Sequence, residues 1–420
     1  MKWEKVKIKE ICTGIYDGPH ATPPISSDGA IFLGITNFRN GRLDLSEIRY
    51  ISEADFPKWT KRVIPKENDI VFSYEATLNL YAIIPSGFRG CLGRRMALLR
   101  VNENKVYYKF LYYYFYSESW RRVIKTNTVL GATVDRIPLI KFPDFIVELP
   151  PLEMQYKIAN ILSSYDDLIE NNQKQIKLLE EAAQRLYKEW FVNLRFPGYE
   201  NAPIIDGVPE GWSMVKVGEV IKYEIGGGWG EETIDEKFDN PAYVIRGTDL
   251  YGLTHGDFND IPYRFHSDSN LKARKLIDGD IIFEISGGSK NEGVARTALI
   301  RSNLLKIFSE PVMCASFCKL VRFDSLEIAQ YMYDTFKYLR ECGKTSEFDK
   351  KSASSIVNYR WKDFLMQQLI LLPNEKILTN YNRLAINLYN QILCKSILIA
   401  KLVEARDKLL PKLMSGEIEV

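Results

Sequence analysis

A chain of 420 residues is long for one hydrophobic core, and at roughly 150 residues per domain it predicts two or three domains. Apolar residues make up 46% of the chain and charged residues 26%, which excludes disordered, collagen-like and membrane-embedded classes. Because 56 Lys and Arg stand against 54 Asp and Glu, the net charge of +2 alone indicates neither a strongly basic nucleic-acid binder nor an acidic protein.

The charge is unevenly divided along the chain. Residues 1–150 carry 22 basic and 16 acidic side chains, a net charge of +6, whereas residues 197–373 carry 21 and 26, a net charge of −5. The six cysteines lack regular pairing distances, so we expect reduced thiols and a cytoplasmic setting. The opening MKWEKVKIKE lacks the apolar core of a signal peptide, and no apolar run is long enough to cross a bilayer.

The first part of the chain, residues 1–150, alternates short apolar runs with turn residues and predicts an α/β segment. Strands are expected at residues 30–35 and 69–73, and a helix over the aromatic-rich residues 107–120. Residues 151–196 then predict a long helix.

The second part repeats this order after a linker at residues 197–211, which are rich in Pro and Gly. Residues 212–373 predict a second α/β segment, and residues 374–420 predict a second long helix. Strands are expected at residues 242–247 and 280–285, and a helix at residues 328–339.

The two parts are copies of one unit. Trp3 to Lys7 matches Trp212 to Lys216 at an offset of 209 residues, and Asn68 to Phe72 matches Gly279 to Phe283 at 211. Further matches are Leu99 to Val101 with Val321 to Phe323, at 222, and Asp144-Phe145 with Asp363-Phe364, at 219. A drift of this size is what small loop insertions produce, so the sequence predicts an internal repeat.

Both long helices carry apolar residues at alternating spacings of four and three. This period of 3.5 residues, sustained over more than four heptads, is typical of a coiled-coil seam; two ordinary core helices are the alternative. The first seam comprises Ile158, Leu162, Tyr165, Ile169, Asn172, Ile176, Leu179, Ala183, Leu186 and Trp190. The second comprises Tyr381, Ala385, Leu388, Ile392, Lys395, Ile399, Leu402, Arg406, Leu409 and Leu413.

Each seam has one polar residue at the same place in its frame, and the second helix contains a proline near its end. Asn172 and Lys395 occupy the same place in the two frames, and one polar seam residue can fix helix register at some cost in stability. Pro411 is expected to end or kink the second helix, so that Leu413 lies past its last regular turn.

Catalytic machinery is largely missing from the sequence. His20, His255 and His266 give little material for a histidine triad or metal site, and Cys314 and Cys318 lack a second ligand pair, so no metal is expected. The glycine run from Gly226 to Gly230 has neither the ending of a phosphate-binding loop nor the spacing of a dinucleotide motif, and predicts a flexible loop.

Two weak enzymatic signals have simpler explanations. The run from Asn240 to Tyr243 approximates the N-P-P-Y motif of adenine methyltransferases, but Ala242 replaces the second proline and no cofactor glycine motif precedes it. Asp280 and Glu284 could suggest a metal-dependent nuclease, yet no suitably spaced Lys follows. Strand and turn roles are the preferred interpretation of both.

Two globules on long helices without catalytic residues suggest a bivalent binder. Polar, basic and aromatic side chains on loops are the candidate contacts, because Arg and Lys read guanine, Asn and Gln read adenine, and phosphates need only donors and positive charge. In the first globule the candidates are Tyr16, His20, Thr36, Asn37, Arg39, Asn40, Arg42, Tyr74, Arg94 and Arg95. In the second they are Trp229, Arg246, Thr248, Arg274, Lys275, Ser289, Lys290, Asn291, Lys344, Lys350 and Lys351.

Four motifs in order resemble those of the specificity subunits of type I restriction-modification systems. The run from Leu149 to Gln155, followed by Ile158-Ala159, resembles the start of that family's central helix. The other three run from Leu186 to Glu200, from Pro209 to Trp212, and from Arg406 to Ile418. Met154 replaces the family's usual Glu, and the second helix start, Leu372 to Glu375, lacks the second proline.

The resemblance implies an architecture and a division of labour. The globules would be two target recognition domains of α/β fold, each binding half of a split, asymmetric sequence in double-stranded DNA, separated by two long antiparallel coiled-coil helices. The helices would dock two modification subunits, which are adenine methyltransferases, and ATP-dependent restriction subunits would join that core. The chain itself would be non-catalytic and would need no cofactor.

Two other classes remain open on the sequence: a stand-alone or fused adenine methyltransferase, and a coiled-coil scaffold that binds no DNA. For the preferred class, a helix over residues 155–190 is roughly 50 Å long, comparable to about 15 base pairs. We therefore expect helix length to set the unread spacer between half-sites. We also expect the +6 globule to supply more of the phosphate-dependent affinity, through Arg94 and Arg95.

Overall fold

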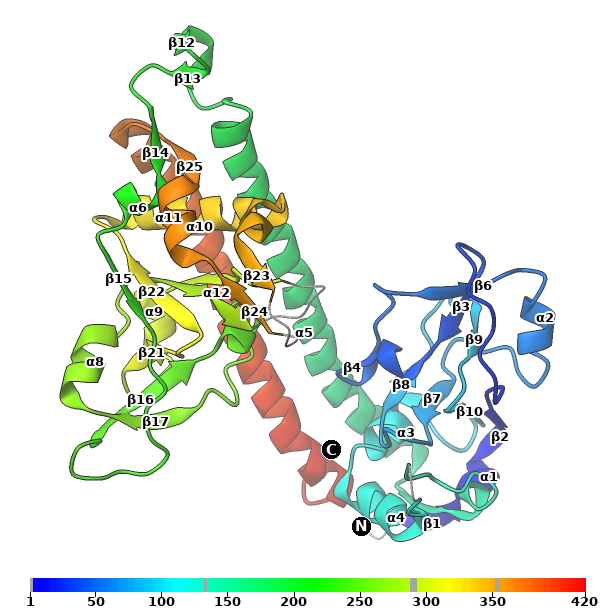
Figure 1. Ribbon diagram of the computed structural model, residues 1–420. Coiled ribbons are helices and arrows are strands. Elements are labelled where there is room, and N and C mark those ends of the chain that lie inside the picture. The colour runs from blue at the N-terminus through cyan, green and yellow to red at the C-terminus, as the bar shows by residue number, and fades with distance from the viewer. Residues whose placement is uncertain (1–2, 132–133, 288–292, 352–355) are drawn as a thin grey trace. The chain divides into compact units, whose positions relative to one another are not determined.

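The computed structural model describes residues 3–131, 134–287, 293–351 and 356–420 and divides into two compact units (Figure 1). The first unit comprises Met1–Asp167 and Val403–Val420, and the second comprises Leu168–Leu402. The long helices α5 (Leu152–Tyr187) and α12 (Glu375–Ser415) each contribute to both units.

The first unit is built from small sheets and short helices. Its strands are β1 (Glu4–Lys7), β2 (Cys12–Asp17), β3 (Ala30–Leu33), β4 (Phe38–Arg39), β5 (Arg42–Leu43), β6 (Arg49–Ile51), β7 (Ile70–Ser73), β8 (Tyr81–Ile83), β9 (Gly90–Leu92), β10 (Met96–Val101) and β11 (Ile146–Leu149). Its short helices are α1 (Ile8–Ile11), α2 (Phe56–Trp59), α3 (Tyr108–Tyr114) and α4 (Glu118–Asn127), with 3-10 turns η1 (Ile35–Asn37) and η2 (Phe142–Asp144).

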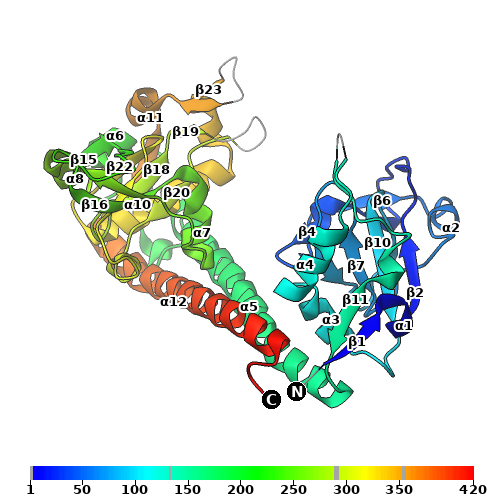
Figure 2. The same ribbon diagram turned by 90° about the horizontal axis from the view of Figure 1, so that it is seen from below.

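The central sheet of the first unit has the strand order β2-β10-β7-β8, of which Figure 2 labels β2, β10 and β7. This sheet has a hydrophobic core on each face. Strand β7 explains how: Ile70 and Phe72 face the core formed with α3 and α4, while Val71 faces a second core formed with β3 and β9. This follows from the two-residue period of a strand, which sends neighbouring side chains to opposite faces. The second core is closed by the sheet β6-β3-β9.

The second unit repeats these sheets. Its strands are β12 (Ile204–Ile205), β13 (Val208–Pro209), β14 (Ser213–Lys216), β15 (Tyr223–Gly226), β16 (Asn240–Ile245), β17 (Tyr263–His266), β18 (Ile281–Glu284), β19 (Ser286–Gly287), β20 (Thr297–Leu299), β21 (Val312–Cys314), β22 (Cys318–Arg322), β23 (Asp349–Lys351), β24 (Val357–Tyr359) and β25 (Leu369–Leu372). Its helices between α5 and α12 are α6 (Val217–Val220), α7 (Leu250–His255), α8 (Asp268–Arg274), α9 (Ser302–Leu305), α10 (Leu326–Glu341) and α11 (Trp361–Gln367). A π-helical turn, η3 (Lys188–Val192), ends α5, and the 3-10 turns are η4 (Tyr199–Asn201), η5 (Gly247–Asp249) and η6 (Lys344–Phe348).

Three sheets of the first unit correspond strand by strand to three sheets of the second. The order β15-β22-β18-β20 matches β2-β10-β7-β8, the order β17-β16-β21 matches β6-β3-β9, and the pair β14-β25 matches β1-β11. The strands expected at residues 30–35, 69–73, 242–247 and 280–285 are confirmed as β3, β7, β16 and β18, and the helix expected at residues 328–339 is confirmed as α10. The helix expected over residues 107–120 is instead two helices, α3 and α4, separated by residues 115–117. The fold is therefore α/β and internally repeated, as the sequence predicted.

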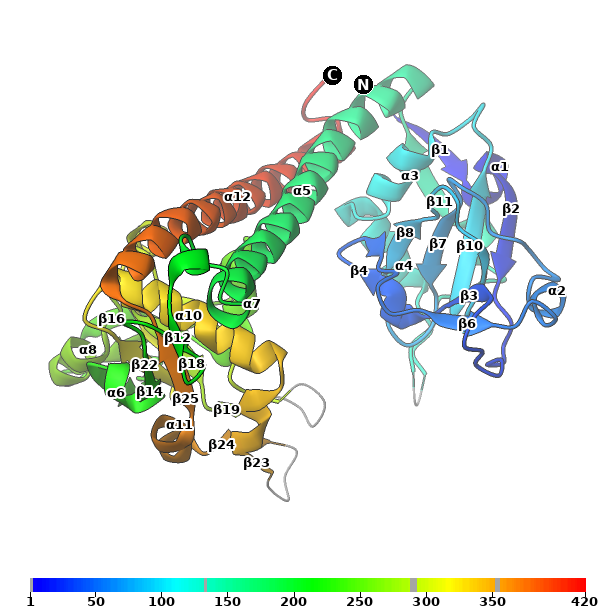
Figure 3. The same ribbon diagram turned by 90° about the horizontal axis from the view of Figure 1, so that it is seen from above.

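Each unit packs against a pair of antiparallel helix segments. In the first unit, Asp166 of α5 accepts hydrogen bonds from the Tyr113 hydroxyl at 2.5 Å and from Nη1 of Arg406 at 2.7 Å, which joins α3, α5 and α12. In the second unit, the part of α5 after Asp167 lies beside the first part of α12 (Figure 3), and Tyr187 and Trp190 share a core with Tyr381.

The expectation for Pro411 is wrong. Helix α12 continues through Pro411 to Ser415, and Leu413, which was expected past the last regular turn, lies inside the helix and is only 1% exposed. Leu413 and Met414 pack into the core of the first unit with Ile158 and Leu162. The burial of these two side chains offsets the loss of the hydrogen bond that proline cannot donate.

Candidate nucleic-acid interface

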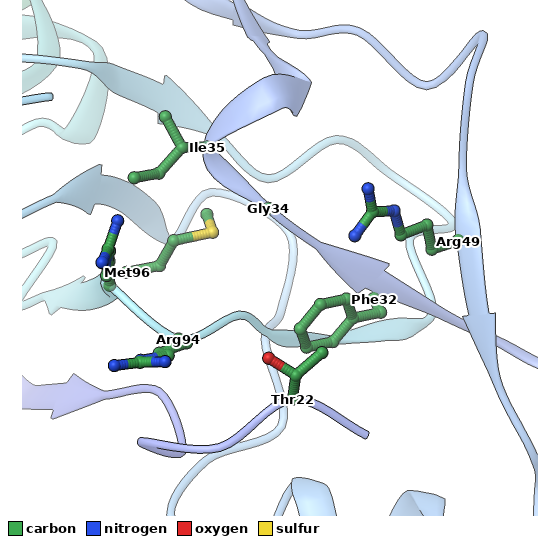
Figure 4. Close-up of a pocket in the computed structure, with 8 residues that line it drawn as sticks. Thr22, Phe32, Gly34, Ile35, Arg49, Arg94 and Met96 are labelled. Atoms are coloured by element: carbon green, nitrogen blue, oxygen red, sulfur yellow. The ribbon is translucent and has the colours of Figure 1, made fainter. Parts of the chain in front are cut away.

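A cavity of about 320 Å³ opens on the first unit, beside the turn that joins β9 to β10 (Figure 4). Its size falls at the low end of small-ligand sites. Arg49 and Arg94 lie on opposite sides of it, with the apolar side chains of Phe32 and Met96 between them. The lining residues are Thr22, Phe32, Gly34, Ile35, Arg49, Arg94, Arg95 and Met96.

The charges of Arg49 and Arg94 are uncompensated. Both side chains are exposed, and among the described residues neither has an acidic partner within 4.0 Å. Four other arginines of this unit are paired with carboxylates: Arg39 with Asp44, Arg62 with Asp17, Arg89 with Glu53 and Arg95 with Glu75. Uncompensated guanidinium groups beside an apolar floor can bind a phosphate, or the O6 and N7 acceptors of guanine.

The sequence-predicted contacts of the first unit fall into three groups by exposure. Tyr16, Arg42 and Arg95 are half-buried. Asn37 and Tyr74 are buried. The exposed residues are His20, Thr36, Arg39, Asn40 and Arg94.

The two buried residues have structural partners instead of free surface. The Asn37 side chain accepts the N–H of Gly34 at 2.8 Å and donates to the carbonyls of Asp44 and Glu47 at 3.1 and 3.2 Å. Tyr74 is 6% exposed, and burial, together with the charges of Asp17 and Glu75, raises the pKa of its hydroxyl. Neither side chain has a surface from which to contact DNA.

The predicted contacts of the second unit are also divided. Trp229, Thr248, Lys275, Lys344 and Lys350 are exposed, whereas Arg246 and Arg274 are half-buried. Ser289, Lys290 and Asn291 lie outside the described residues, and for Lys351 only the backbone, in β23, is described.

The half-buried arginines of the second unit are held by its own backbone and carboxylates. Arg246 donates from Nε and Nη2 to the carboxylate of Asp249 at 2.8 to 3.1 Å, and from Nη2 to the Asp260 carbonyl at 2.9 Å. Nε of Arg274 donates to the Gly226 carbonyl at 2.8 Å. These two guanidinium groups therefore organise loops of the second unit.

The exposed Trp229 is stacked by an arginine. The guanidinium of Arg264 lies 5.0 Å from the centre of the Trp229 ring, and its Nη2 donates to Oε1 of Glu232 at 3.0 Å. A cation over an indole face is a stabilising contact even at an exposed site. The indole still has 41% of its surface exposed and can stack with another planar group.

The two weak enzymatic signals have structural roles. Asp280 and Glu284 are 0% and 1% exposed, and Arg322 and Arg296 respectively donate pairs of hydrogen bonds to them. Asn240 to Tyr243 lies in strand β16, as expected. In the part of the chain that the structure describes, no group of three or more His, Cys, Asp or Glu residues could hold a metal ion.

The predicted seam residues all avoid full exposure. Asn172 is buried and donates from Nδ2 to the Leu168 carbonyl of its own helix at 2.8 Å, whereas Lys395 is half-buried. The buried members are Ile158, Leu162, Ile169, Asn172, Ile176, Ala183, Trp190, Tyr381, Ala385, Ile392, Ile399 and Leu413. The half-buried members are Tyr165, Leu179, Leu186, Leu388, Lys395, Leu402, Arg406 and Leu409. Their role as a coiled-coil seam stays a prediction.

Thr22 and Arg49 were missed at the sequence level. Arg49 begins strand β6, whose partner β3 brings it to the cavity, and Thr22 lies in the long connection between β2 and β3. Strand β3 pairs with β6 on one side and with β9 on the other, and these two pairings bring Arg49 near Arg94, which lies 45 positions later in the chain. No local sequence pattern predicts these pairings.

Taken together, two copies of an α/β domain with polar and basic loops share two long helices, an arrangement that suits binding at two places. Comparisons with known proteins show what the chain is similar to. Residues 1–181 match the family described as "Type I restriction modification DNA specificity domain". The chain is 25% identical over 384 residues to the type I restriction enzyme MjaIX specificity subunit of Methanocaldococcus jannaschii, covering 89% of this chain and 82% of that protein.

Two further comparisons agree. The HindI specificity subunit of Haemophilus influenzae is 20% identical over 448 residues, covering 92% of this chain and 94% of that protein. The crystal structure of the S subunit of the type I system of M. genitalium superposes with a TM-score of 0.60 at 14% identity, covering 98% of this chain and 96% of that one, which establishes likeness of fold. Over most of its length, the chain is therefore similar to specificity subunits of type I restriction-modification systems.

No helix in the described ranges is long and apolar enough to cross a membrane.

Proposed function

We propose that this chain is the DNA-recognition component of a type I restriction-modification complex and that each α/β domain, hereafter the first and second recognition domains, binds one half of a bipartite target. The observation that carries the proposal is that the two domains share one scaffold but expose different side chains. Equivalent strands form equivalent sheets, while the first domain presents Arg49 and Arg94 and the second presents Trp229. A common scaffold with different contacts suits the recognition of two different half-sites.

The charge distribution supports unequal contributions to affinity. The first recognition domain, with +6, has two uncompensated arginines at its cavity, whereas the second, with −5, uses Arg246 and Arg274 internally. Phosphate contacts release counterions and dominate the salt dependence of binding. The first domain therefore supplies the larger electrostatic share, and the second depends more on contacts with base edges.

The proposal assigns methylation and cleavage to partners. Two modification subunits would dock on α5 and α12 and methylate adenine, and restriction subunits with an ATP-driven motor would complete the complex. Each of the two helices leaves apolar side chains exposed, which a docked subunit would cover. They are Leu168, Leu178, Leu384 and Leu398.

The test is a gel shift with the modification subunit present. DNA carrying the methylated motif of the host is compared with scrambled DNA of equal length and composition. The proposal predicts at least a thousandfold preference for the specific DNA at physiological salt, on the order of that seen for specific DNA binders. Equal binding of both would favour a scaffold that does not read DNA, and binding of S-adenosylmethionine by this chain alone would favour a methyltransferase.

A further inference from the structure

The two recognition domains present the same tight turn at the same place in their scaffolds. In the first domain, the turn runs from Leu92 at the end of β9 to Met96 at the start of β10, with three residues between them. In the second, it runs from Cys314 at the end of β21 to Cys318 at the start of β22, also with three residues between. Strand registers agree, because Met96 pairs with Ser73 of β7 as Cys318 pairs with Glu284 of β18.

Matching hydrogen bonds fix the backbone of both turns. The carbonyl of Arg95 accepts the N–H of Tyr74 at 3.1 Å, and the carbonyl of Phe317 accepts the N–H of Ile285 at 2.9 Å. The next carbonyl accepts a glycine N–H in each case: Met96 from Gly18 at 2.8 Å and Cys318 from Gly227 at 2.9 Å. Arg95 and Phe317 are therefore structurally equivalent positions.

One glycine in each domain, Gly18 in the first and Gly227 in the second, allows the segment that contains it to pack closely against the turn. A Cβ on Gly18 would overlap the carbonyl oxygen of Gly93, and a Cβ on Gly227 would overlap that of Ala315. Each turn is therefore held both by these backbone hydrogen bonds and by the close packing of the glycine against it. Side chains on such a backbone are presented rigidly, which is what precise recognition requires.

The side chains on the two turns differ completely in chemistry. The first turn carries Arg94 and Arg95, which line the cavity. The second carries Ser316 and Phe317 at these positions, and both are exposed. The Phe317 side chain is 58% exposed and contacts no other aromatic ring among the described residues. An aromatic side chain that the domain neither buries nor supports is available to a partner molecule.

We infer that Phe317 is a specificity-determining residue of the second recognition domain and contacts the C5-methyl group of a thymine in the major groove. The inference rests on the proposed function. Among the groups that base pairs display in the major groove, the thymine methyl is the apolar one, and Phe is one of the side chains that contact it. In the first turn Arg95 is paired with Glu75, whereas Arg94 has no acidic partner within 4.0 Å among the described residues and suits guanine or phosphate. The same turn therefore reads different groups in the two half-sites.

The net charge of the second domain agrees with this assignment. A domain with −5 gains little from phosphates overall, so contacts with base edges must provide much of its discrimination. A rigid apolar side chain loses little conformational entropy on contact, because a phenyl ring has only two side-chain torsions to fix.

The test uses the full chain assembled with its modification subunit and DNA duplexes in which single thymines of each half-site are replaced by uracil, which lacks the methyl group. Wild-type complex should bind one such duplex about fourfold more weakly, the value expected for one apolar carbon removed from a contact. Phe317→Ala should weaken binding to the thymine duplex and be insensitive to that uracil substitution. Phe317→Leu should restore part of the difference in affinity between the thymine and uracil duplexes. Met366→Ala is the matched control, because Met366 is also 58% exposed but lies on α11, away from the turn.

Three results would overturn the inference. Phe317→Ala could bind like the wild type, which would make the ring irrelevant. It could lose the same factor on thymine and uracil duplexes, which would indicate a wedge between base pairs or a contact with the modification subunit. The third result would be that uracil at every thymine position of the second half-site leaves the affinity of the wild-type complex unchanged. Failure of the proposed function looks different, because wild-type complex would then not distinguish specific from scrambled DNA.

Discussion

Arg322 holds Asp280 with two hydrogen bonds, from Nε at 2.7 Å and from Nη2 at 2.8 Å. Asp280 precedes strand β18 and is completely buried, while Arg322 ends the neighbouring strand β22. The first recognition domain has the same arrangement: Arg100 donates to Asp69 at 2.9 and 2.7 Å. The carboxylates also accept the N–H of Ile277 and of Lys66 respectively. Each domain thus fastens its central sheet with the same ion pair.

Removing one partner of this pair should destabilise the second domain strongly. Asp280→Ala leaves the Arg322 guanidinium without its carboxylate and the Ile277 N–H without its acceptor. The free energy of unfolding, from urea titration, should fall by about 3 to 5 kcal/mol. Asp324→Ala, which breaks an exposed pair with Lys222, should change it by less than about 1 kcal/mol. Equal effects of the two substitutions would contradict the fastening role.

Adjacent glycines give a second matched comparison. A Cβ on Gly227 would overlap the carbonyl oxygens of Cys314 and Ala315, whereas a Cβ on Gly226 would meet nothing within 4 Å. Gly227→Ala should therefore lower the free energy of unfolding by about 1 to 3 kcal/mol, the usual cost of overpacking. Gly226→Ala should leave it nearly unchanged, as measured by the same titration. A stable Gly227→Ala protein would mean that the turn is not held as closely as described.

The salt dependence of DNA binding tests the cavity of the first domain. Arg49→Gln and Arg94→Gln should each reduce the slope of log affinity against log salt by about 1, as expected for one lost phosphate contact. Arg89→Gln is the control, because Arg89 is already paired with Glu53 and stacks on Phe56 at 4.3 Å. An unchanged slope in both cavity variants would remove the cavity from the interface.

A buried carboxylate predicts a pH effect on stability. Asp334 on α10 accepts hydrogen bonds from the hydroxyls of Tyr381 and Tyr389 on α12 and from Nε2 of Gln330. Burial raises the pKa of Asp334 above its ordinary value of 3.8, although these hydrogen bonds oppose the shift. The folded state therefore holds the proton more tightly than the unfolded state.

The stability that protonated Asp334 contributes is fully present below the pKa of this group in the unfolded state. It is lost as the pH rises through the pKa of the group in the folded state. Asp334→Asn cannot titrate, so its unfolding free energy relative to wild type should increase as pH rises from about 4 towards neutrality. Urea titrations of both proteins at several pH values measure this difference. Parallel pH profiles would show that Asp334 does not titrate with a raised pKa.

The spacer prediction concerns α5 and α12, which have 36 and 41 residues. Inserting one heptad into each helix keeps the seam in frame and adds about 10 Å at 1.5 Å per residue, equivalent to about 3 base pairs. The preferred gap between half-sites should lengthen accordingly. It is measured by selecting bound DNA from a library with variable spacers, and an unchanged gap would dissociate helix length from spacer length.

The strands, the long helices and the repeat could be predicted because they depend on local periodicity and on offsets within the chain. The exposure of individual side chains could not be predicted, because it depends on residues that are distant in the sequence. Asn37 looked like a base-reading amide but bonds to the backbone of its own turn, and Pro411 looked like a helix end but is outweighed by the packing of Leu413 and Met414. Phe317 could have been paired with Arg95 through the offset of 222 residues, yet only the registers show that the turns are equivalent.

Two recognition domains that read two separate halves of one target should direct methylation to a motif of two parts. Sequencing the methylated adenines of host DNA tests this expectation most directly, with the wild-type chain and with a chain whose residues 212–373 come from a relative. The account predicts a motif of two parts separated by unread bases, of which the exchange alters one part and preserves the other. A single uninterrupted motif, or a change in both parts after the exchange, would contradict it.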